Sequence, residues 1–180
     1  MTRKPFGVNL IFLPAVTPPD YPGYIRAIVD GSIKIVETAT HSAEVAAVAE
    51  GSRHQGHPKC TSVRHSLKAE SIDCEAVSVD GFECGCHLGE DDVPNFILLP
   101  RAAEELKIPF VASGGMVDGR SLVAALSLGA DGMNMGTRFM AIKEAPIHDH
   151  VKQAPVAASE LDTRLVMRPL RNTEVGASSK

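Results

Sequence analysis

The segment from residue 108 to residue 139 constrains the fold most, because it holds two short apolar runs that each end in a glycine-containing turn. The first run, residues 108–112, is apolar and partly β-branched, which predicts a buried strand that leads into Ser113-Gly114-Gly115. The second run, residues 132–135, predicts another buried strand and leads into Gly136-Thr137. We therefore expect two consecutive parallel strands to deliver small loops to the same edge of one sheet.

Two such loops in tandem favour a site for a phosphomonoester. Glycine leaves backbone N–H groups unobstructed, and Ser113 and Thr137 each add a hydroxyl group. In barrels of alternating strands and helices, the loops after the last two strands commonly bind phosphate. A single loop of this kind is explained by a tight strand–helix turn alone, whereas the pair predicts phosphate binding.

The rest of the chain repeats the same strand–helix unit. Asp118 is the expected N-cap of a helix over residues 121–128, which stops at Gly129. A helix is expected to begin near Pro100, and a helix over residues 147–159 is expected to kink or end at Pro155. The other predicted strands are 6–12, 33–36 and 76–79, and the other predicted helices are 24–30, 42–50 and 62–70. This spacing is typical of a parallel sheet or barrel.

One segment interrupts the repeat. A strand is due just before Lys59, yet residues 53–58 are polar and contain no apolar run. The sequence therefore does not predict a regular strand there, and the position of Lys59 depends on that missing strand.

Length and composition exclude several functional classes. The 180 residues form one domain over residues 1–170, and residues 171–180 are expected to be a flexible tail. A net charge of −4, no Trp and two Tyr argue against nucleic-acid binding, and no apolar run approaches the ~20 residues that span a bilayer. Four cysteines in a chain of this size favour free thiols and a cytoplasmic location.

Polar residues follow the predicted strands at the edge where parallel α/β folds bind ligands. A lysine, an asparagine and an aspartate beside a phosphate loop suit a polar aromatic cofactor that carries a phosphate. Lys59 could neutralise charge on a reduced ring, and Asp80 could accept a hydrogen bond from a sugar-like hydroxyl. Taken alone, Asn9 could equally fix a strand end and Lys59 could be a solvated residue before a helix. The residues at these strand ends are Asn9, Glu37, Lys59, Asp80, His87, Ser113, Gly114, Gly115, Gly136 and Thr137.

His87 lies on a glycine-flanked loop at the mouth of the predicted sheet, where a histidine can accept a proton near neutral pH. An ordinary surface histidine is the simpler alternative. Cys84 and Cys86 next to it raise the idea of a metal site, but no second ligand pair accompanies them, so no metal is predicted.

Several motifs in the same order resemble the nitronate monooxygenase family, formerly called 2-nitropropane dioxygenases. The motifs are KPFGVNL, KCTSVRH, SVDGFEC followed by His87 and GEDD, ASGGMVDGRSLVAALSLGADGMNMGTRFMA, and EAPIHDHVKQA. The resemblance implies an FMN-dependent (β/α)8 TIM barrel. It also implies oxidation of alkyl nitronates, in some members nitroalkanes, by O2 to a carbonyl compound and nitrite.

The resemblance also assigns roles to residues. It places Asn9 and Lys59 against the isoalloxazine and Asp80 near the polar edge of FMN. It also makes Gly85 a cofactor-binding residue, on the loop that precedes the catalytic His87. It implies that the FMN phosphate is held by Ser113, Gly114, Gly115, Gly136 and Thr137. The phosphate site inferred from the residues and the one implied by the family coincide.

The chain departs from the family pattern in three ways. It begins at what resembles the third strand, so we expect a partial barrel that lacks the first two strands and the C-terminal portion, with open edges that could pair with another copy. Cys86 replaces a glycine, and residues 53–58 lack the family's apolar run. The alternatives are a flavin-dependent enoyl reductase and a non-catalytic remnant that binds FMN or phosphate.

Overall fold

The fold is a curled parallel sheet with helices on its outer face, seen in a computed structural model that describes residues 4–11, 19–38, 55–85 and 91–163. Within these residues, six strands pair in chain order, and every neighbouring pair is parallel. The strands are β1 (Gly7–Leu10), β2 (Ile35–Thr38), β3 (Gln55–Cys60), β4 (Val77–Asp80), β5 (Phe110–Ser113) and β6 (Gly132–Met133). The predicted partial (β/α)8 architecture is confirmed.

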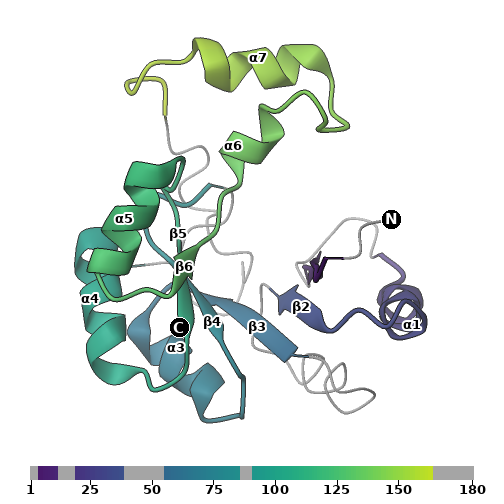
Figure 1. Cartoon of the computed structure of the whole chain (residues 1–180), viewed down its shortest axis with the longest axis vertical. Helices are drawn as coiled ribbons and strands as arrows, with labels where there is room; N and C mark the ends of the chain where they lie inside the picture. The colour runs from purple at the N-terminus through teal and green to yellow at the C-terminus, as the bar shows by residue number, and fades with distance from the viewer. Residues whose placement is uncertain (1–3, 12–18, 39–54, 86–90, 164–180) are drawn as a thin grey trace, which may run out of the picture.

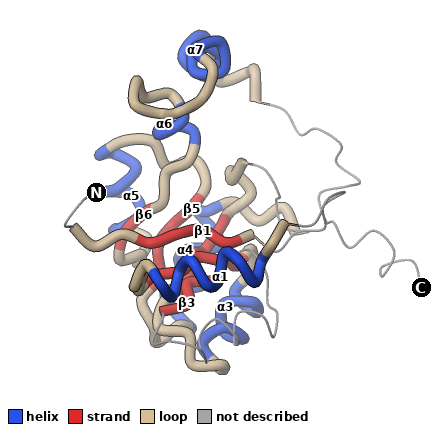
Figure 2. The backbone as a smooth tube through the Cα atoms, turned by 90° about the vertical axis from the view of Figure 1, so that its right-hand side faces the viewer, coloured by secondary structure: helices blue, strands red, loops and turns tan. Residues whose placement is uncertain are grey.

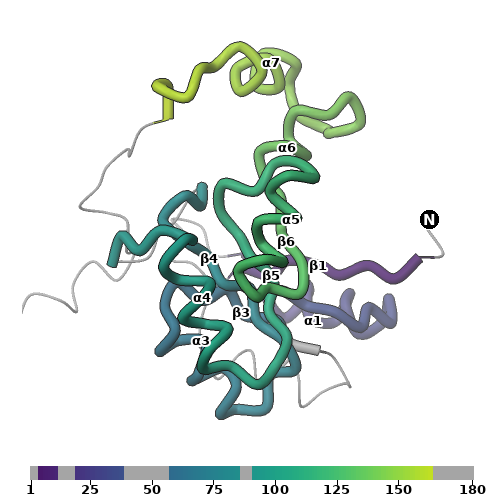
Figure 3. Tube along the Cα trace, turned by 60° about the vertical axis from the view of Figure 1, so that its left-hand side comes forward, coloured from purple at the N-terminus to yellow at the C-terminus, as the bar shows by residue number. Residues whose placement is uncertain are grey.

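Helices follow the strands, and several of them cover the convex side of the sheet. They are α1 (Tyr21–Asp30), α3 (Val63–Glu70), α4 (Asn95–Glu105), α5 (Gly119–Ser127), α6 (Thr137–Met140) and α7 (Asp149–Ala157). In Figures 1 and 3, α3, α4 and α5 lie along one side of the strands, whereas α6 and α7 extend away from the sheet. Figure 2 shows α1 and β1 crossing in front of the other strands, which makes the curl of the sheet visible.

Alternation along the strands separates an apolar outer face from a polar inner face. In β4, Val77 and Val79 are buried in the core against the helices, whereas Ser78 and Asp80 lie on the other face and hydrogen-bond each other. The core extends through Leu99 of α4, which is fully buried, and a smaller cluster packs α1 on β1 and β2. The concave face is thus free for polar chemistry.

The predicted strand–helix–strand unit between residues 108 and 139 is confirmed. The Asp118 carboxylate accepts hydrogen bonds from the backbone N–H groups of Arg120 and Ser121, which caps α5. The pKa of the Asp118 carboxyl group is lowered to about 2, chiefly by a hydrogen bond from the Arg120 side chain and next by the bond from the Ser121 backbone N–H group. The stabilisation from these hydrogen bonds together is therefore present above the ordinary carboxyl pKa and is lost as the pH falls toward 2.

The prediction that no regular strand precedes Lys59 was wrong, because β3 forms over Gln55–Cys60. Its neighbours β2 and β4 satisfy its backbone on both sides, in a register that pairs Glu37 with His57 and Lys59 with Ser78. His57 and Lys59 alternate with buried Pro58 and Cys60. An apolar run is not needed, because the inner face that receives the polar side chains is itself polar.

The predicted start of a helix near Pro100 was also wrong. Helix α4 begins at Asn95 rather than near Pro100, and Pro100 lies inside it. Pro100 has no N–H group, so the backbone carbonyl of Phe96 loses its usual helical partner. Phe96 is 77% exposed, so water can reach this carbonyl. The buried side chains of Leu98 and Leu99 keep the helix in place. Helix α7 likewise continues through Pro155 to Ala157. The short helix α6 was not predicted.

Some predictions fall on residues that the structure does not describe. These are the helix over residues 42–50, residues 86–90 with Cys86 and His87, and the tail over residues 171–180. Within the described ranges, no helix combines the length and the apolar character needed to cross a bilayer.

Gly129 gives a stability prediction. It ends α5 with a φ of +96°, and a Cβ placed there would lie 2.5 Å from the Cβ of Ala103. Gly129→Ala is therefore expected to lower the free energy of unfolding by about 2 kcal/mol, measured by urea denaturation. Gly119→Ala is the matched control, because a Cβ there meets nothing within 4 Å. Equal stability of the two variants would contradict this role for Gly129.

Candidate cofactor site

The polar inner face carries a connected network at the carboxyl ends of the strands. Lys59 Nζ lies 3.1 Å from Glu37 Oε2, and Asn134 Nδ2 donates to Glu37 Oε1 at 2.9 Å. The same Asn134 amide donates to Ser78 Oγ at 3.0 Å, and Ser78 donates to Asp80 Oδ1 at 2.7 Å. The network therefore runs from β3 through β2 and the end of β6 to β4.

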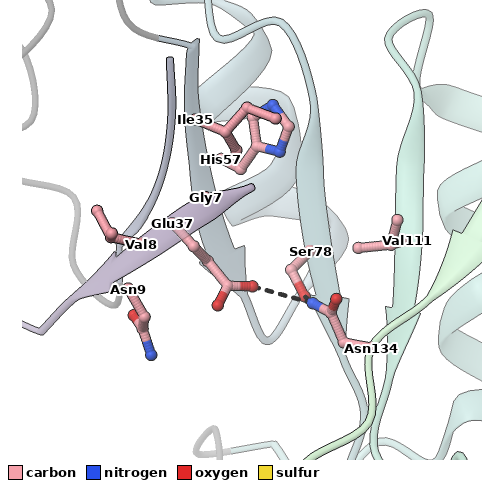
Figure 4. Close-up of a pocket in the computed structure, with 9 residues that line it drawn as sticks. All are labelled: Gly7, Val8, Asn9, Ile35, Glu37, His57, Ser78, Val111 and Asn134. Atoms are coloured by element: carbon pink, nitrogen blue, oxygen red, sulfur yellow. Dashed lines mark hydrogen bonds between the residues drawn. The ribbon is translucent and has the colours of Figure 1, made fainter. Parts of the chain in front are cut away.

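The contact between Asn134 and Glu37 exists only because the sheet is curled. Asn134 follows β6 and Glu37 lies in β2, four strands away in sheet order. In a flat sheet these strands would be about 19 Å apart. Figure 4 shows both side chains pointing into the hollow of the sheet, joined by a dashed line.

A pocket of ≈ 290 Å³ lies on this concave face. Asn9 borders it from β1, the Glu37 and Ser78 side chains also line it, and the His57 imidazole lies apart from the Glu37–Asn134 pair (Figure 4). Burial lowers the pKa of His57, against the raising effect of the Glu37 and Glu75 charges, and so favours the neutral imidazole. The full lining is Gly7, Val8, Asn9, Ile35, Glu37, His57, Ser78, Val111 and Asn134.

Asp80 lies where the network meets the glycine turns. Burial raises the pKa of its carboxyl group, while the hydrogen bond from Ser78 and the charge of Lys59 oppose that change. Cys84 lies close by, and its Sγ is 3.4 Å from Ser113 Oγ. Burial, and secondarily the Asp80 charge, raises the pKa of Cys84 to about 12, so the thiol stays protonated.

The two glycine turns lie at the same edge of the sheet, because β5 and β6 are adjacent and parallel. Gly114 and Gly115 have φ values of +97° and +69°, which favour glycine. Among the described residues, no hydrogen bond uses the backbone N–H groups of Gly114, Gly115, Gly136 or Thr137. The α5 N-terminus is occupied by its own Asp118, so an anion at this edge would meet these free amides instead.

The space beside the two turns differs. A Cβ placed on Gly136 meets no atom within 4 Å, and the same is true of Gly85, whereas a Cβ on Gly114 would lie 2.7 Å from the Cys84 backbone nitrogen and one on Gly115 would lie 3.3 Å from the Glu83 Cβ. Unpaired amides around open space are what an oxyanion requires. The residues present therefore fit a phosphorylated cofactor.

Most of the sequence-predicted site residues come together at this edge of the sheet. Lys59, Asp80 and Ser113 belong to one cluster with the two turns, whereas the exposed Asn9 borders the pocket from β1, and its side chain makes no hydrogen bond among the described residues. His87 lies outside the described residues.

Sequence reasoning missed two residues near this site, Asn134 and Asn95. Asn134 lies within the predicted strand 132–135, and Asn95 lies before the predicted helix start. Glu37 was noted only as a residue at a strand end. The one sequence signal that could have indicated these residues is a polar residue next to an apolar run.

A curled sheet of parallel strands, with helices on its outer face and polar side chains on its inner face, defines an α/β half-barrel protein. The sequence profile of the nitronate monooxygenase family matches residues 2–174, and the chain belongs to that family.

Two curated relatives are named as a dehydrogenase and a probable monooxygenase. The chain is 35% identical over 91% of its length to a Rhodococcus jostii (3aS,4S,5R,7aS)-5-hydroxy-7a-methyl-1-oxo-octahydro-1H-indene-4-carboxyl-CoA dehydrogenase, of which it covers 45%. It is 37% identical over 58% of its length to a probable nitronate monooxygenase of Bacillus subtilis, of which it covers 32%. The chain thus spans less than half the length of these curated relatives.

Solved structures agree on the fold. FabK from Thermotoga maritima superimposes with a TM-score of 0.77 and 31% identity, covering 88% of this chain and 49% of that one. Nitroalkane oxidase from Streptomyces ansochromogenes superimposes with a TM-score of 0.72 and 25% identity, covering 84% of this chain and 55% of that one.

Proposed function

We propose that this chain is the FMN-binding part of an oxidoreductase that oxidises alkyl nitronates, and in some cases nitroalkanes, with O2 to a carbonyl compound and nitrite. The observation that carries the proposal is the pair of glycine turns, with free amides, beside the Lys59–Glu37 network. Family membership supports the reaction class. Bound FMN would supply the redox-active ring.

The glycine turns are proposed to hold the cofactor phosphate. The backbone N–H groups of Gly114, Gly115 and Gly136 would donate to its oxygens, and the hydroxyls of Ser113 and Thr137 would add further donors. The open space at Gly136 supports this assignment.

The remaining polar residues are proposed to contact the rest of FMN. The Lys59 ammonium, held by Glu37 at 3.1 Å, would stabilise negative charge on the ring. Asp80 would accept a hydrogen bond from a ribityl hydroxyl, Asn9 would contact the ring, and Gly85 would let the chain approach it. These residues orient the cofactor so that the nitronate carbon can lie against its reactive edge.

His87 is proposed as the group that takes the α-proton of a neutral nitroalkane. His87→Asn is expected to leave FMN affinity unchanged and to lower nitroalkane turnover about 100-fold, with a smaller loss on a preformed nitronate that has no such proton. Steady-state assays with nitroethane and with ethylnitronate measure the difference. Equal losses on both substrates would contradict a role in proton transfer.

A second candidate is a dehydrogenase of a cyclic acyl-CoA, because the Rhodococcus relative so named matches 91% of this chain. Anaerobic bleaching of the bound FMN spectrum separates the candidates. Bleaching by propyl-2-nitronate supports the proposal, and bleaching only by an acyl-CoA thioester favours the dehydrogenase. Bleaching only by NADH favours the reductase alternative. A protein that takes up no FMN would be a non-catalytic remnant.

Self-association is also proposed, through the open side of the sheet. Leu122, Val123 and Leu126 of α5 are 37%, 63% and 50% exposed, beside the edge strand β6, while Ala125 of the same helix is buried. A second copy that covers this surface would bury apolar area. Sedimentation velocity tests this proposal, and a monomer at all concentrations would contradict it.

The free thiols of Cys60, Cys74 and Cys84 support the cytoplasmic location, which stays a prediction.

A further inference from the structure

Asn95 makes an unusual pair of contacts with the turn after β5. It is the first residue of α4, it is 3% exposed, and its Nδ2 donates to the carbonyl oxygens of both Ser113 and Gly114, at 2.9 and 2.8 Å. One buried side-chain amide therefore holds two consecutive peptide groups of the glycine turn.

These contacts fix where the neighbouring N–H groups point. In a trans peptide the C=O and the following N–H point in opposite directions, and the described residues contain no cis peptide. Because both carbonyls face Asn95, the N–H groups of Gly114 and Gly115 face away from it, on a common side. Successive amides that point to one side form a concavity that binds anions.

The orientation of Asn95 is itself held from several directions. Its backbone N–H donates to both carboxylate oxygens of Glu83, at 3.2 and 3.1 Å, and the turn that carries Glu83 bonds back to β5 through Gly81 N–H and Ser113 O at 3.1 Å. A Cβ on Gly81 would lie only 2.4 Å from Asn95 Oδ1. That oxygen is buried and accepts no hydrogen bond within the described chain. The opposite amide orientation would place it against two carbonyl oxygens, so the observed orientation is favoured.

We propose that Asn95 is a positioning residue for the cofactor phosphate. Through the two carbonyls it aims the Gly114 and Gly115 amides at the phosphate, without touching the phosphate itself. This inference rests on the proposed FMN site and adds to it the residue that preorganises one of its two turns.

The test compares FMN with riboflavin, which lacks the phosphate. Asn95→Leu keeps a similar side-chain size and removes both donated bonds, whereas Asn95→Thr keeps one donor. We expect Asn95→Leu to weaken FMN binding about 10- to 30-fold, to leave riboflavin affinity within about 2-fold, and Asn95→Thr to fall between. Flavin fluorescence titration measures the affinities, and the 31P resonance of bound FMN should move toward that of free FMN.

Glu83→Gln is the matched control. A glutamine there retains an oxygen that accepts from the Asn95 backbone, so the FMN-to-riboflavin affinity ratio should stay that of the unmodified chain. Suppose that the unmodified chain binds FMN more tightly than riboflavin, and that Asn95→Leu and Asn95→Thr keep the same FMN-to-riboflavin affinity ratio. In that case the positioning role is wrong, while the phosphate site stands. Equal affinity of the unmodified chain for both flavins would overturn both. A loss of FMN and riboflavin affinity together would mark Asn95 as merely structural.

Discussion

Gly136→Val is expected to abolish FMN retention while the chain still folds. Gly136 has φ −102° and ψ −72°, so its backbone does not require glycine, and a Cβ there meets nothing within 4 Å. In the proposed complex that same space holds the phosphate, so a branched side chain would displace it. Because several charge-assisted hydrogen bonds would be lost together, we expect FMN affinity to fall by more than about 100-fold. The flavin content of purified protein and fluorescence titration measure the loss.

Gly119→Val controls for the substitution itself. Gly119 also has open space around its Cβ position, but it lies in the first turn of α5, where Asp118 already occupies the free amides. Circular dichroism should be the same for both variants, and only Gly136→Val should lose FMN. Full FMN content in Gly136→Val would place the phosphate elsewhere.

Lys59→Met is expected to have the second largest effect, a fall of about 100-fold in turnover. Removing one preorganised donor from a developing negative charge typically costs that much. The variant also leaves the half-buried Glu37 carboxylate without its ammonium partner, so part of any loss could come from that unpaired charge. Stopped-flow reduction by propyl-2-nitronate measures the rate.

The double variant Lys59→Met/Glu37→Gln separates the two causes. A glutamine at residue 37 is uncharged and keeps an oxygen that can accept from Asn134. Relative to Lys59→Met alone, we expect the double variant to recover any thermal stability and FMN affinity lost to the unpaired charge, but not turnover. If turnover recovers as well, Lys59 serves only to neutralise Glu37, and its proposed role at the ring is wrong.

The fold was predictable wherever apolar runs and caps agreed. Phe110 and Ala112 are buried, Asp118 caps the next helix, and Gly129 ends it, so each local signal matched the global structure. The strand β3 was missed because its inward side chains, such as His57, face a polar interior. Periodicity detects apolar faces, and it fails where a strand is held by its neighbours instead.

The site was predictable to the level of strand ends but not of contacts. The sequence places Lys59 and the glycine turns at one edge, because parallel strands share their direction. It does not reveal that Asn134 reaches Glu37 across the curled sheet, or that Asn95 holds the turn after β5. Both contacts join residues far apart in the chain, at distances set by curvature and helix packing.

The most direct test of the phosphate site is the affinity of the unmodified chain for FMN compared with riboflavin, measured by fluorescence titration under identical conditions. If the turns at Gly115 and Gly136 hold the phosphate together, FMN should bind more tightly than riboflavin by about 100-fold or more. Equal affinity for the two flavins would contradict this account.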